Sequence, residues 1–187
     1  ATTRTGLITG PLRDRFGLTA RLEYYEPADL QSIVTRAAGI LGVDLDDEGA
    51  AEIARRSRGT PRIGNRLLRQ VRDFAQVERS GVVDGPVARD GLVFFGVDDL
   101  GLDKPSREIL SVLCKHFDGG PVGLKTLSIS VSEAEDTVED VYEPYLIQQG
   151  LLNRTPKGRM ATAAAYDHLG ITRPVKPQRP AGSLFED

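Results

Sequence analysis

The chain has 187 residues, of which 27% are charged and 40% are hydrophobic, and its formal net charge is -3. These values are ordinary for a globular protein and exclude a uniformly basic nucleic-acid-binding chain, so any contact with nucleic acid must come from a local patch. The single cysteine, Cys114, excludes an internal disulfide, and the two histidines do not have the spacing of metal ligands, so we expect no metal site. No apolar run is long enough to span a bilayer, and we therefore expect a cytoplasmic protein.

Residues 1–25 look like the end of a larger domain. Ala1–Arg4 is predicted to end a strand, and Pro11–Phe16 to form one or two helical turns that Gly17 stops. Leu18–Tyr25 alternates in polarity and is predicted to be a strand. Because one or two strands cannot form a core, we expect the chain to be a piece of a longer protein.

Residues 26–98 are predicted to form a bundle of four helices joined by short loops. A first helix should run from Pro27 to Gly42, a second should begin at Asp46 or Asp47, and a fourth should run from Asp84 to about Phe95. In the second helix we expect Ala50, Ala51, Ile53 and Ala54 to face inward, and Arg55, Arg56 and Arg58 to face outward.

The third helix of this bundle carries an arginine in its first turn. Thr60 is a good N-cap, Pro61 suits the first helical position, and the helix should continue to about Arg79. Arg62 would then lie beside free backbone N–H groups, a place that suits an anion and phosphate above all. The alternative is an ordinary solvated arginine on an amphipathic helix.

Residues 104–170 follow a predicted linker, Val97–Asp103, and have the element order of a winged-helix domain. Residues 171–187 are rich in proline and are expected to be a disordered tail. The predicted elements are helices at about Lys104–His116 and Leu124–Ile129, a helix from the cap Ser132 to Gly150, strands at Leu151–Thr155 and Arg159–Thr162, and a helix at about Thr162–His168.

The helix that would enter the major groove in a helix-turn-helix protein is strongly acidic here, so phosphates would repel it and it cannot be a conventional recognition helix. Either it is a solvated face or it is a docking surface for a basic protein. Its carboxylates are Glu133, Glu135, Asp136, Glu139, Asp140 and Glu143.

The hairpin that follows this helix is basic. Arg154, Lys157 and Arg159 are expected on a protruding tip. Such a wing can contact duplex DNA through its phosphates without reading the sequence. The alternative is a solvated basic hairpin with no ligand.

The chain contains no Gly-Lys pair and therefore no P-loop, and no apolar strand ends in a pair of acids that could hold magnesium. We do not expect the chain alone to hydrolyse a nucleotide. Arginines at three places could still assist a nucleotide that is bound elsewhere: Arg4, the pair Arg13 and Arg15, and Arg62.

Several segments, in this order, resemble the RuvB family of bacterial Holliday-junction branch-migration motors, which are AAA+ ATPases. The resemblance covers about residues 1–172. The segments near Arg15 and Arg62 alone would indicate only an AAA+ protein, whereas the later ones are specific to the family. The segments are Ala1–Arg4, Pro11–Gly17, Arg21–Glu23, Gly59–Arg62, Asn65–Arg69, Glu143–Gly150 and Arg154–Ala161.

The resemblance implies a mainly α chain, with a remnant of the α/β AAA+ core at 1–25, the helical AAA+ lid at 26–98 and a winged-helix DNA-binding domain at 104–170. It also implies roles for single residues. Thr2 and Thr3 fall at sensor 1, Arg15 at the arginine finger that acts in trans with Arg13 beside it, Arg62 at sensor 2, and Tyr25 and Pro61 near the adenine.

The resemblance further implies ATP with Mg²⁺ as cofactor of the longer protein, assembly into a homohexameric ring, and double-stranded DNA, Holliday junctions, RuvA and RuvC as partners. The Walker motifs and the hairpin that docks RuvA would precede Ala1, so tight nucleotide binding by this chain alone is not expected. From the residues alone, a winged-helix DNA-binding regulator or adaptor remains the alternative.

Overall fold

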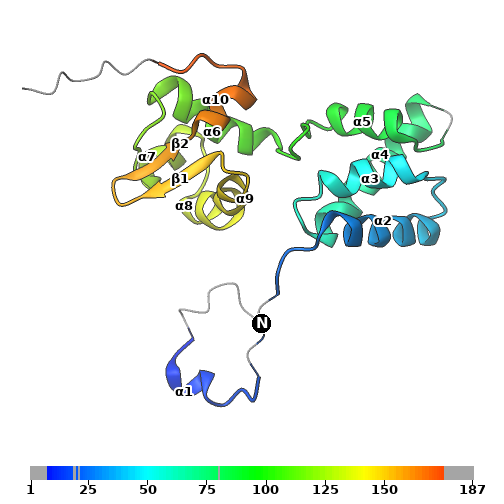
Figure 1. The fold of residues 1–187 in the computed structure, drawn as a ribbon, viewed down its shortest axis with the longest axis horizontal. Helices are drawn as coiled ribbons and strands as arrows, with labels where there is room; N and C mark the ends of the chain where they lie inside the picture. The colour runs from blue at the N-terminus through cyan, green and yellow to red at the C-terminus, as the bar shows by residue number, and fades with distance from the viewer. Residues whose placement is uncertain (1–7, 19, 21, 80, 175–187) are drawn as a thin grey trace, which may run out of the picture.

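The computed structural model describes residues 8–18, 20, 22–79 and 81–174. The predictions for Thr2, Thr3 and Arg4, and most of the predicted tail, lie outside these residues. A short helix, α1 (Gly10–Arg13), is present near the beginning and lies apart from the two helical units (Figure 1). The strand predicted at Leu18–Tyr25 is wrong, because the described residues of that segment form no strand; a strand requires a partner, and the backbone of Tyr25 instead bonds to a turn between two helices.

The first helical unit contains the predicted bundle: α2 (Pro27–Leu41), α3 (Asp47–Arg55), α4 (Pro61–Glu78) and α5 (Gly85–Phe94) (Figure 1). Local signals explain the helix ends. The side chains of Asp46 and Asp84 accept hydrogen bonds from backbone N–H groups in the first turns of α3 and α5 at 2.7 and 2.8 Å. Gly42 ends α2 in the left-handed conformation, as expected for a C-cap.

The core of this unit is formed by apolar side chains that are removed from water. Burying each large one contributes roughly 1.5–3 kcal/mol. The predicted faces of α3 are partly wrong, because Ala51 is exposed while Arg56 and Arg58, just beyond the helix, are buried. The fully buried large members of the core are Val34, Ile53, Leu67, Leu68, Val71, Val83 and Leu92.

The second unit has the predicted order of helices followed by a hairpin (Figure 1). The predicted cap at Ser132 is wrong: Ser132 has a φ of +56°, and the helix begins only at Glu135. The helix also contains a π-helical turn just before Pro144, a residue that has no N–H to donate to the preceding turn. The elements are α6 (Lys104–His116), α7 (Leu124–Ser130), α8 (Glu135–Thr137), η2 (Val138–Tyr142), α9 (Glu143–Gln148), β1 (Leu152–Thr155), β2 (Gly158–Ala161) and α10 (Ala163–Leu169).

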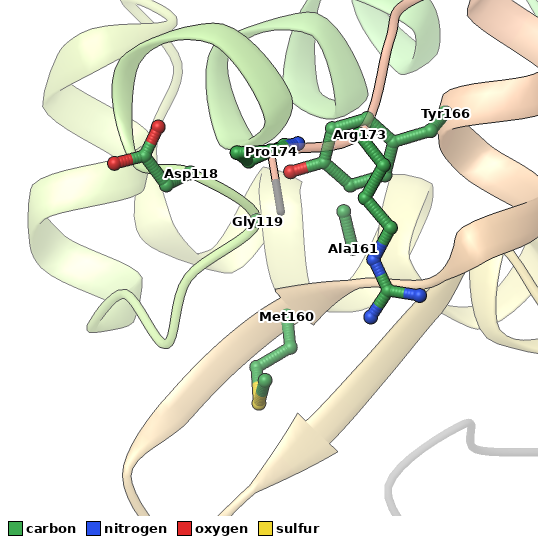
Figure 2. Close-up of a pocket in the computed structure, with 7 residues that line it drawn as sticks. All are labelled: Asp118, Gly119, Met160, Ala161, Tyr166, Arg173 and Pro174. Atoms are coloured by element: carbon green, nitrogen blue, oxygen red, sulfur yellow. The ribbon is translucent and has the colours of Figure 1, made fainter. Parts of the chain in front are cut away.

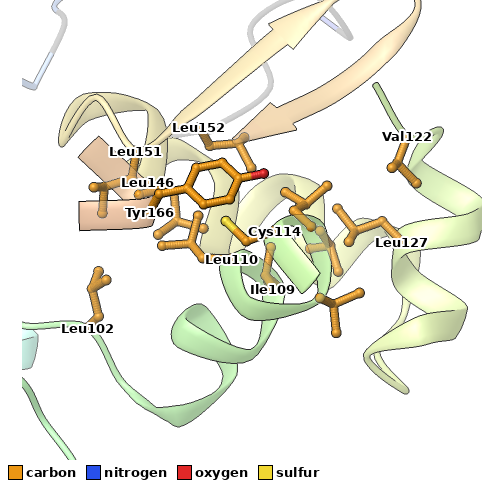
Figure 3. Close-up of a cluster of buried hydrophobic side chains, with 14 of the residues drawn as sticks. Leu102, Ile109, Leu110, Cys114, Val122, Leu127, Leu146, Leu151, Leu152 and Tyr166 are labelled. Carbon is orange, nitrogen blue, oxygen red and sulfur yellow. The ribbon is translucent and has the colours of Figure 1, made fainter. Parts of the chain in front are cut away.

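A separate apolar core lies between α6, α7, α9, α10 and the hairpin (Figure 3). Cys114 is only 3% exposed within it and packs there as a small hydrophobic residue. The hairpin is antiparallel, and its register places Arg154 opposite Arg159. The expected mainly helical fold with one small hairpin is confirmed. None of the helices in the described part of the chain is long and apolar enough to cross a membrane.

Candidate functional site

The start of α4 has the predicted geometry. Thr60 is the N-cap and accepts a hydrogen bond from the amide of Ile63 at 3.4 Å, and Pro61 occupies the first helical position. Arg62 is exposed, and neither its guanidinium nor its amide has a partner among the described residues. One free N–H and one free guanidinium therefore face outward here, fewer groups than expected because Pro61 has no N–H and the Ile63 amide is capped.

The segment before α2 is joined to this turn. The amide of Tyr25 donates to the carbonyl oxygen of Gly59 at 2.9 Å, while the Tyr25 side chain is 49% exposed. Tyr25 and Pro61 therefore lie at the same end of the helical unit as Arg62. Arg15 is exposed just beyond α1, and α1 lies apart from the helical unit that contains α4 (Figure 1).

The turn between α3 and α4 contains two buried arginines that the sequence analysis placed outside. Arg56 is 1% exposed and Arg58 is 8% exposed. Both reach the segment 97–103, whose carbonyl and carboxylate oxygens accept their hydrogen bonds. The acidic composition of that segment, with Asp98, Asp99 and Asp103, was the signal that could have indicated these partners.

The prediction that three cations share an exposed hairpin tip is wrong for Arg159. Arg159 is 8% exposed, its Nε donates to Glu143 Oε1 at 2.6 Å, and its Nη2 lies 3.2 Å from Glu143 Oε2. The Arg159 backbone also exchanges two hydrogen bonds with Val122, at 2.7 and 2.9 Å. Arg159 thus fastens the hairpin to the acidic helix and the strand-like residue before α7.

The other two cations of the hairpin are accessible. Lys157 is exposed at the turn between β1 and β2 and has no partner among the described residues. The side chain of Arg154 is 56% exposed and forms an ion pair with Glu139. An exposed pair of this kind contributes little to stability, so its arginine can exchange the carboxylate for another anion.

The acidic helix has a use that neither interpretation of its sequence anticipated. Glu143 is 1% exposed and pairs with Arg159, and Glu139 contacts both hairpin arginines. These two carboxylates therefore hold the hairpin in place. The negative charge of this helix still makes it unsuitable for insertion into a DNA groove.

A pocket of about 350 Å³ lies between the end of α6, β2 and the residues after α10 (Figure 2). Arg173 and Asp118 stand at different sides of it, and Tyr166 and Met160 contribute apolar surface. Its charged groups are of opposite sign, and none of the residues predicted for nucleotide or DNA contact lines it.

Comparison with known proteins agrees with this architecture. Residues 25–98 match the family model described as the RuvB AAA lid domain, and residues 99–170 match the RuvB C-terminal winged helix domain. The Holliday junction branch migration complex subunit RuvB of Saccharopolyspora erythraea is 59% identical over 188 residues, which cover 100% of this chain and 53% of that protein. The protein of the same name from Mycobacterium tuberculosis is 56% identical over 186 residues, with coverage of 100% and 54%.

The solved structures agree as well. RuvB of Thermotoga maritima, described as a Holliday junction branch migration motor, is 43% identical with a TM-score of 0.85, and the match covers 90% of this chain and 57% of that one. The chain thus spans about half the length of the curated relatives it matches. With both helical units matched in order by models of one family and relatives similar along the whole chain, the chain belongs to the RuvB family, in the part that comprises the AAA lid and the winged-helix domain.

Proposed function

We propose that the chain is the lid and the DNA-binding domain of an ATP-driven motor that moves Holliday junctions during recombination and repair. The observation that carries this proposal is the pairing of two features. The lid presents Arg62 at the start of α4 with no partner among the described residues, and the winged-helix unit presents two accessible cations, Arg154 and Lys157, on the hairpin, next to an acidic helix that carries no lysine or arginine. The first feature suits a phosphate group, and the second suits duplex DNA of any sequence.

ATP with Mg²⁺ is the proposed cofactor of the whole motor, and it would supply the phosphoryl group whose transfer to water drives movement. The residues at the start of α4 fit one side of such a ligand, because Arg62 offers a free guanidinium and a free amide among the described residues. Arg62 would stabilise negative charge on the terminal phosphate, and Tyr25 and Pro61 would flank the adenine. These groups contact a nucleotide that other residues must hold.

Arg15, with Arg13 beside it, is proposed to act on the nucleotide of a neighbouring subunit. An arginine supplied in this way stabilises the charge of the transferring phosphoryl and can raise the rate by roughly 10³–10⁵-fold. Thr2 and Thr3 keep their proposed role as a sensor of the terminal phosphate. The role of Arg15 requires assembly, which we propose to be the homohexameric ring expected from the resemblance.

Lys157 and Arg154 are the residues that we propose for contact with duplex DNA. Arg154 would exchange the carboxylate of Glu139 for a phosphate, whereas Arg159 stays in its buried pair. Holliday junctions, RuvA and RuvC are the proposed partners in the cytoplasm; the relatives are named as subunits of a Holliday junction branch migration complex.

Fluorescence anisotropy with two unrelated duplexes of equal length, at several salt concentrations, tests this function. Both duplexes should bind alike. Each phosphate contact contributes about 0.9 to the slope of log K against log salt, so Arg154→Ala with Lys157→Ala should reduce the magnitude of the slope by up to about 2. Arg36→Ala, which removes an exposed arginine from α2, is the matched control and should change neither affinity nor slope.

Two results would count against the proposal. A preference of about 10³-fold or more for one duplex would indicate a sequence-specific regulator. Equal binding by the double variant and the wild type would show that the hairpin makes no DNA contact, and would leave the unit without its proposed role.

A further inference from the structure

The turn between α3 and α4 has an unusual backbone. Arg58 has a φ of +52° and Gly59 a φ of +70°, so two successive residues are left-handed. For a non-glycine residue this conformation costs about 1–2 kcal/mol, and it persists only where the surroundings hold it. The side chain of Arg58 extends from this turn and makes contacts that can hold it.

Those contacts belong to the winged-helix side of the chain. The Nε of Arg58 donates to the carbonyl oxygen of Gly101 at 2.7 Å, and Nη2 lies 3.1 Å from Asp103 Oδ1. The guanidinium carbon lies 5.1 Å from the centre of the Tyr145 ring. Asp103 is the N-cap of α6 and Tyr145 belongs to α9, so one side chain of the lid contacts the connecting segment and two helices of the winged-helix unit.

The connecting segment is itself packed against the lid. Arg56 donates to the carbonyl oxygen of Val97 at 3.1 Å and pairs with Asp99 at 2.8 Å. A Cβ on Gly101 would lie 2.5 Å from the carbonyl oxygen of Arg56, so the two backbones touch. Tyr145 Oη donates to the carbonyl oxygen of Leu100 at 2.8 Å. Residues 97–103 are therefore held at both ends and do not form a free tether.

The same turn leads directly into the start of α4. Thr60, the cap of α4, and Arg62, its second residue, follow Arg58 by two and four positions. Gly59, between Arg58 and Thr60, is packed so closely against Tyr24 that a Cβ added to Gly59 would lie 2.7 Å from the Cβ of that tyrosine. The start of α4 and the Arg58 backbone are therefore parts of one closely packed turn.

We propose that Arg58 is a positioning residue that holds the winged-helix unit in a fixed orientation relative to the start of α4, so that displacement of Arg62 is transmitted to the DNA-binding hairpin. The fixed orientation rests on the contacts of Arg58 and on the packing of residues 97–103, whereas the transmission rests on the function proposed above. The planar guanidinium suits this role, because it bonds two oxygens and stacks on a ring at the same time.

Two variants separate this role from a general contribution to folding. Arg58→Gly removes the guanidinium but also relieves the left-handed backbone, so the turn itself remains favourable. Arg58→Lys keeps the charge and loses the planar fork, and should give an intermediate result. Arg72→Ala removes an α4 arginine that pairs only with its neighbour Asp73 among the described residues, and is the control.

The orientation is measured by double electron–electron resonance between spin labels at two exposed positions, Arg69→Cys in α4 and Gln148→Cys in α9; the native Cys114 is buried. The wild type and the Arg72→Ala control should give one narrow distance distribution. Arg58→Gly should broaden it, and Arg58→Lys should broaden it less. An Arg58→Gly distribution as narrow as the wild type would overturn the proposal.

The transmission is measured in the full-length motor as branch-migration distance per ATP hydrolysed on a four-way junction. Arg58→Gly should retain ATP hydrolysis and reduce this distance by roughly tenfold. An unchanged distance per ATP would overturn the transmission. If the wild type itself does not migrate junctions with ATP, the proposed function fails, while the label distances still decide whether Arg58 fixes the orientation.

Discussion

Removing one partner of the ion pair between Arg159 and Glu143 should strongly destabilise the winged-helix unit. Glu143 is 1% exposed, and both of its carboxylate oxygens face the guanidinium at 2.6 and 3.2 Å. Arg159→Leu would leave that carboxylate buried without its counter-charge. Breaking a buried pair by removing one partner costs about 3–5 kcal/mol, so we expect the free energy of unfolding to fall by about this amount.

Equilibrium urea unfolding followed by far-UV circular dichroism measures this loss. Arg154→Leu is the matched control, because Arg154 lies on the same face of the hairpin as Arg159 but its side chain is 56% exposed and pairs with Glu139. Losing this exposed pair should lower the free energy of unfolding by no more than about 1 kcal/mol. Replacing both partners, with Arg159→Leu and Glu143→Met, should recover much of the loss since no buried charge remains. Equal losses for Arg159→Leu and Arg154→Leu would refute the reasoning.

Two further predictions concern Arg62 and Asp103. In the full-length motor, Arg62→Ala should slow ATP hydrolysis by about 10²–10³-fold, which is the usual effect of removing one group that stabilises developing charge. The control Arg69→Ala should leave the rate unchanged, and a steady-state ATPase assay measures both variants. Burial would raise the pKa of Asp103, but hydrogen bonds from Ser106 and the charge of Arg58 outweigh it and hold the pKa below its ordinary value of 3.8. The ionised carboxylate of Asp103 therefore makes its full contribution to the free energy of unfolding above pH 3.8. This contribution is lost as the pH falls through the lower pKa of the folded state. Acid unfolding of Asp103→Asn should lack this part of the transition, and an acid limb identical to that of the wild type would contradict the assignment.

The helix boundaries were predictable because they depend on neighbours in the sequence. Thr60 before Pro61, Asp103 before Lys104 and Gly42 after Leu41 each determine a helix end through contacts within a few residues. These signals located the helical bundle and most of the winged-helix elements. They also located Arg62 at the start of α4 without any knowledge of the tertiary structure.

The predicted strand and the predicted hairpin tip failed for a different reason, because both depend on a partner. Leu18–Tyr25 alternates in polarity, but an alternating segment becomes a strand only beside another strand, and the two described strands, β1 and β2, pair with each other in a two-stranded sheet. In the hairpin, the register pairs Arg154 with Arg159 on one face. Alternation could not indicate that this face lies against the acidic helix, or that only one of the two arginines would be buried by it.

The buried arginines of the α3–α4 turn show the limit of reading helical faces from polarity. The rule that charged residues face water holds only when no counter-charge is available in the interior, because the cost of burying a charge is offset by pairing and hydrogen bonding. The acceptors of Arg56 and Arg58 lie 41 to 43 residues further along the chain, in the segment expected to separate two independent units. Three aspartates in so short a linker would be costly side by side unless cations lay near them. The acidic linker and the two arginines Arg56 and Arg58 are thus complementary halves of one junction, and the segment that the sequence predicts as a linker joins the two units through specific contacts.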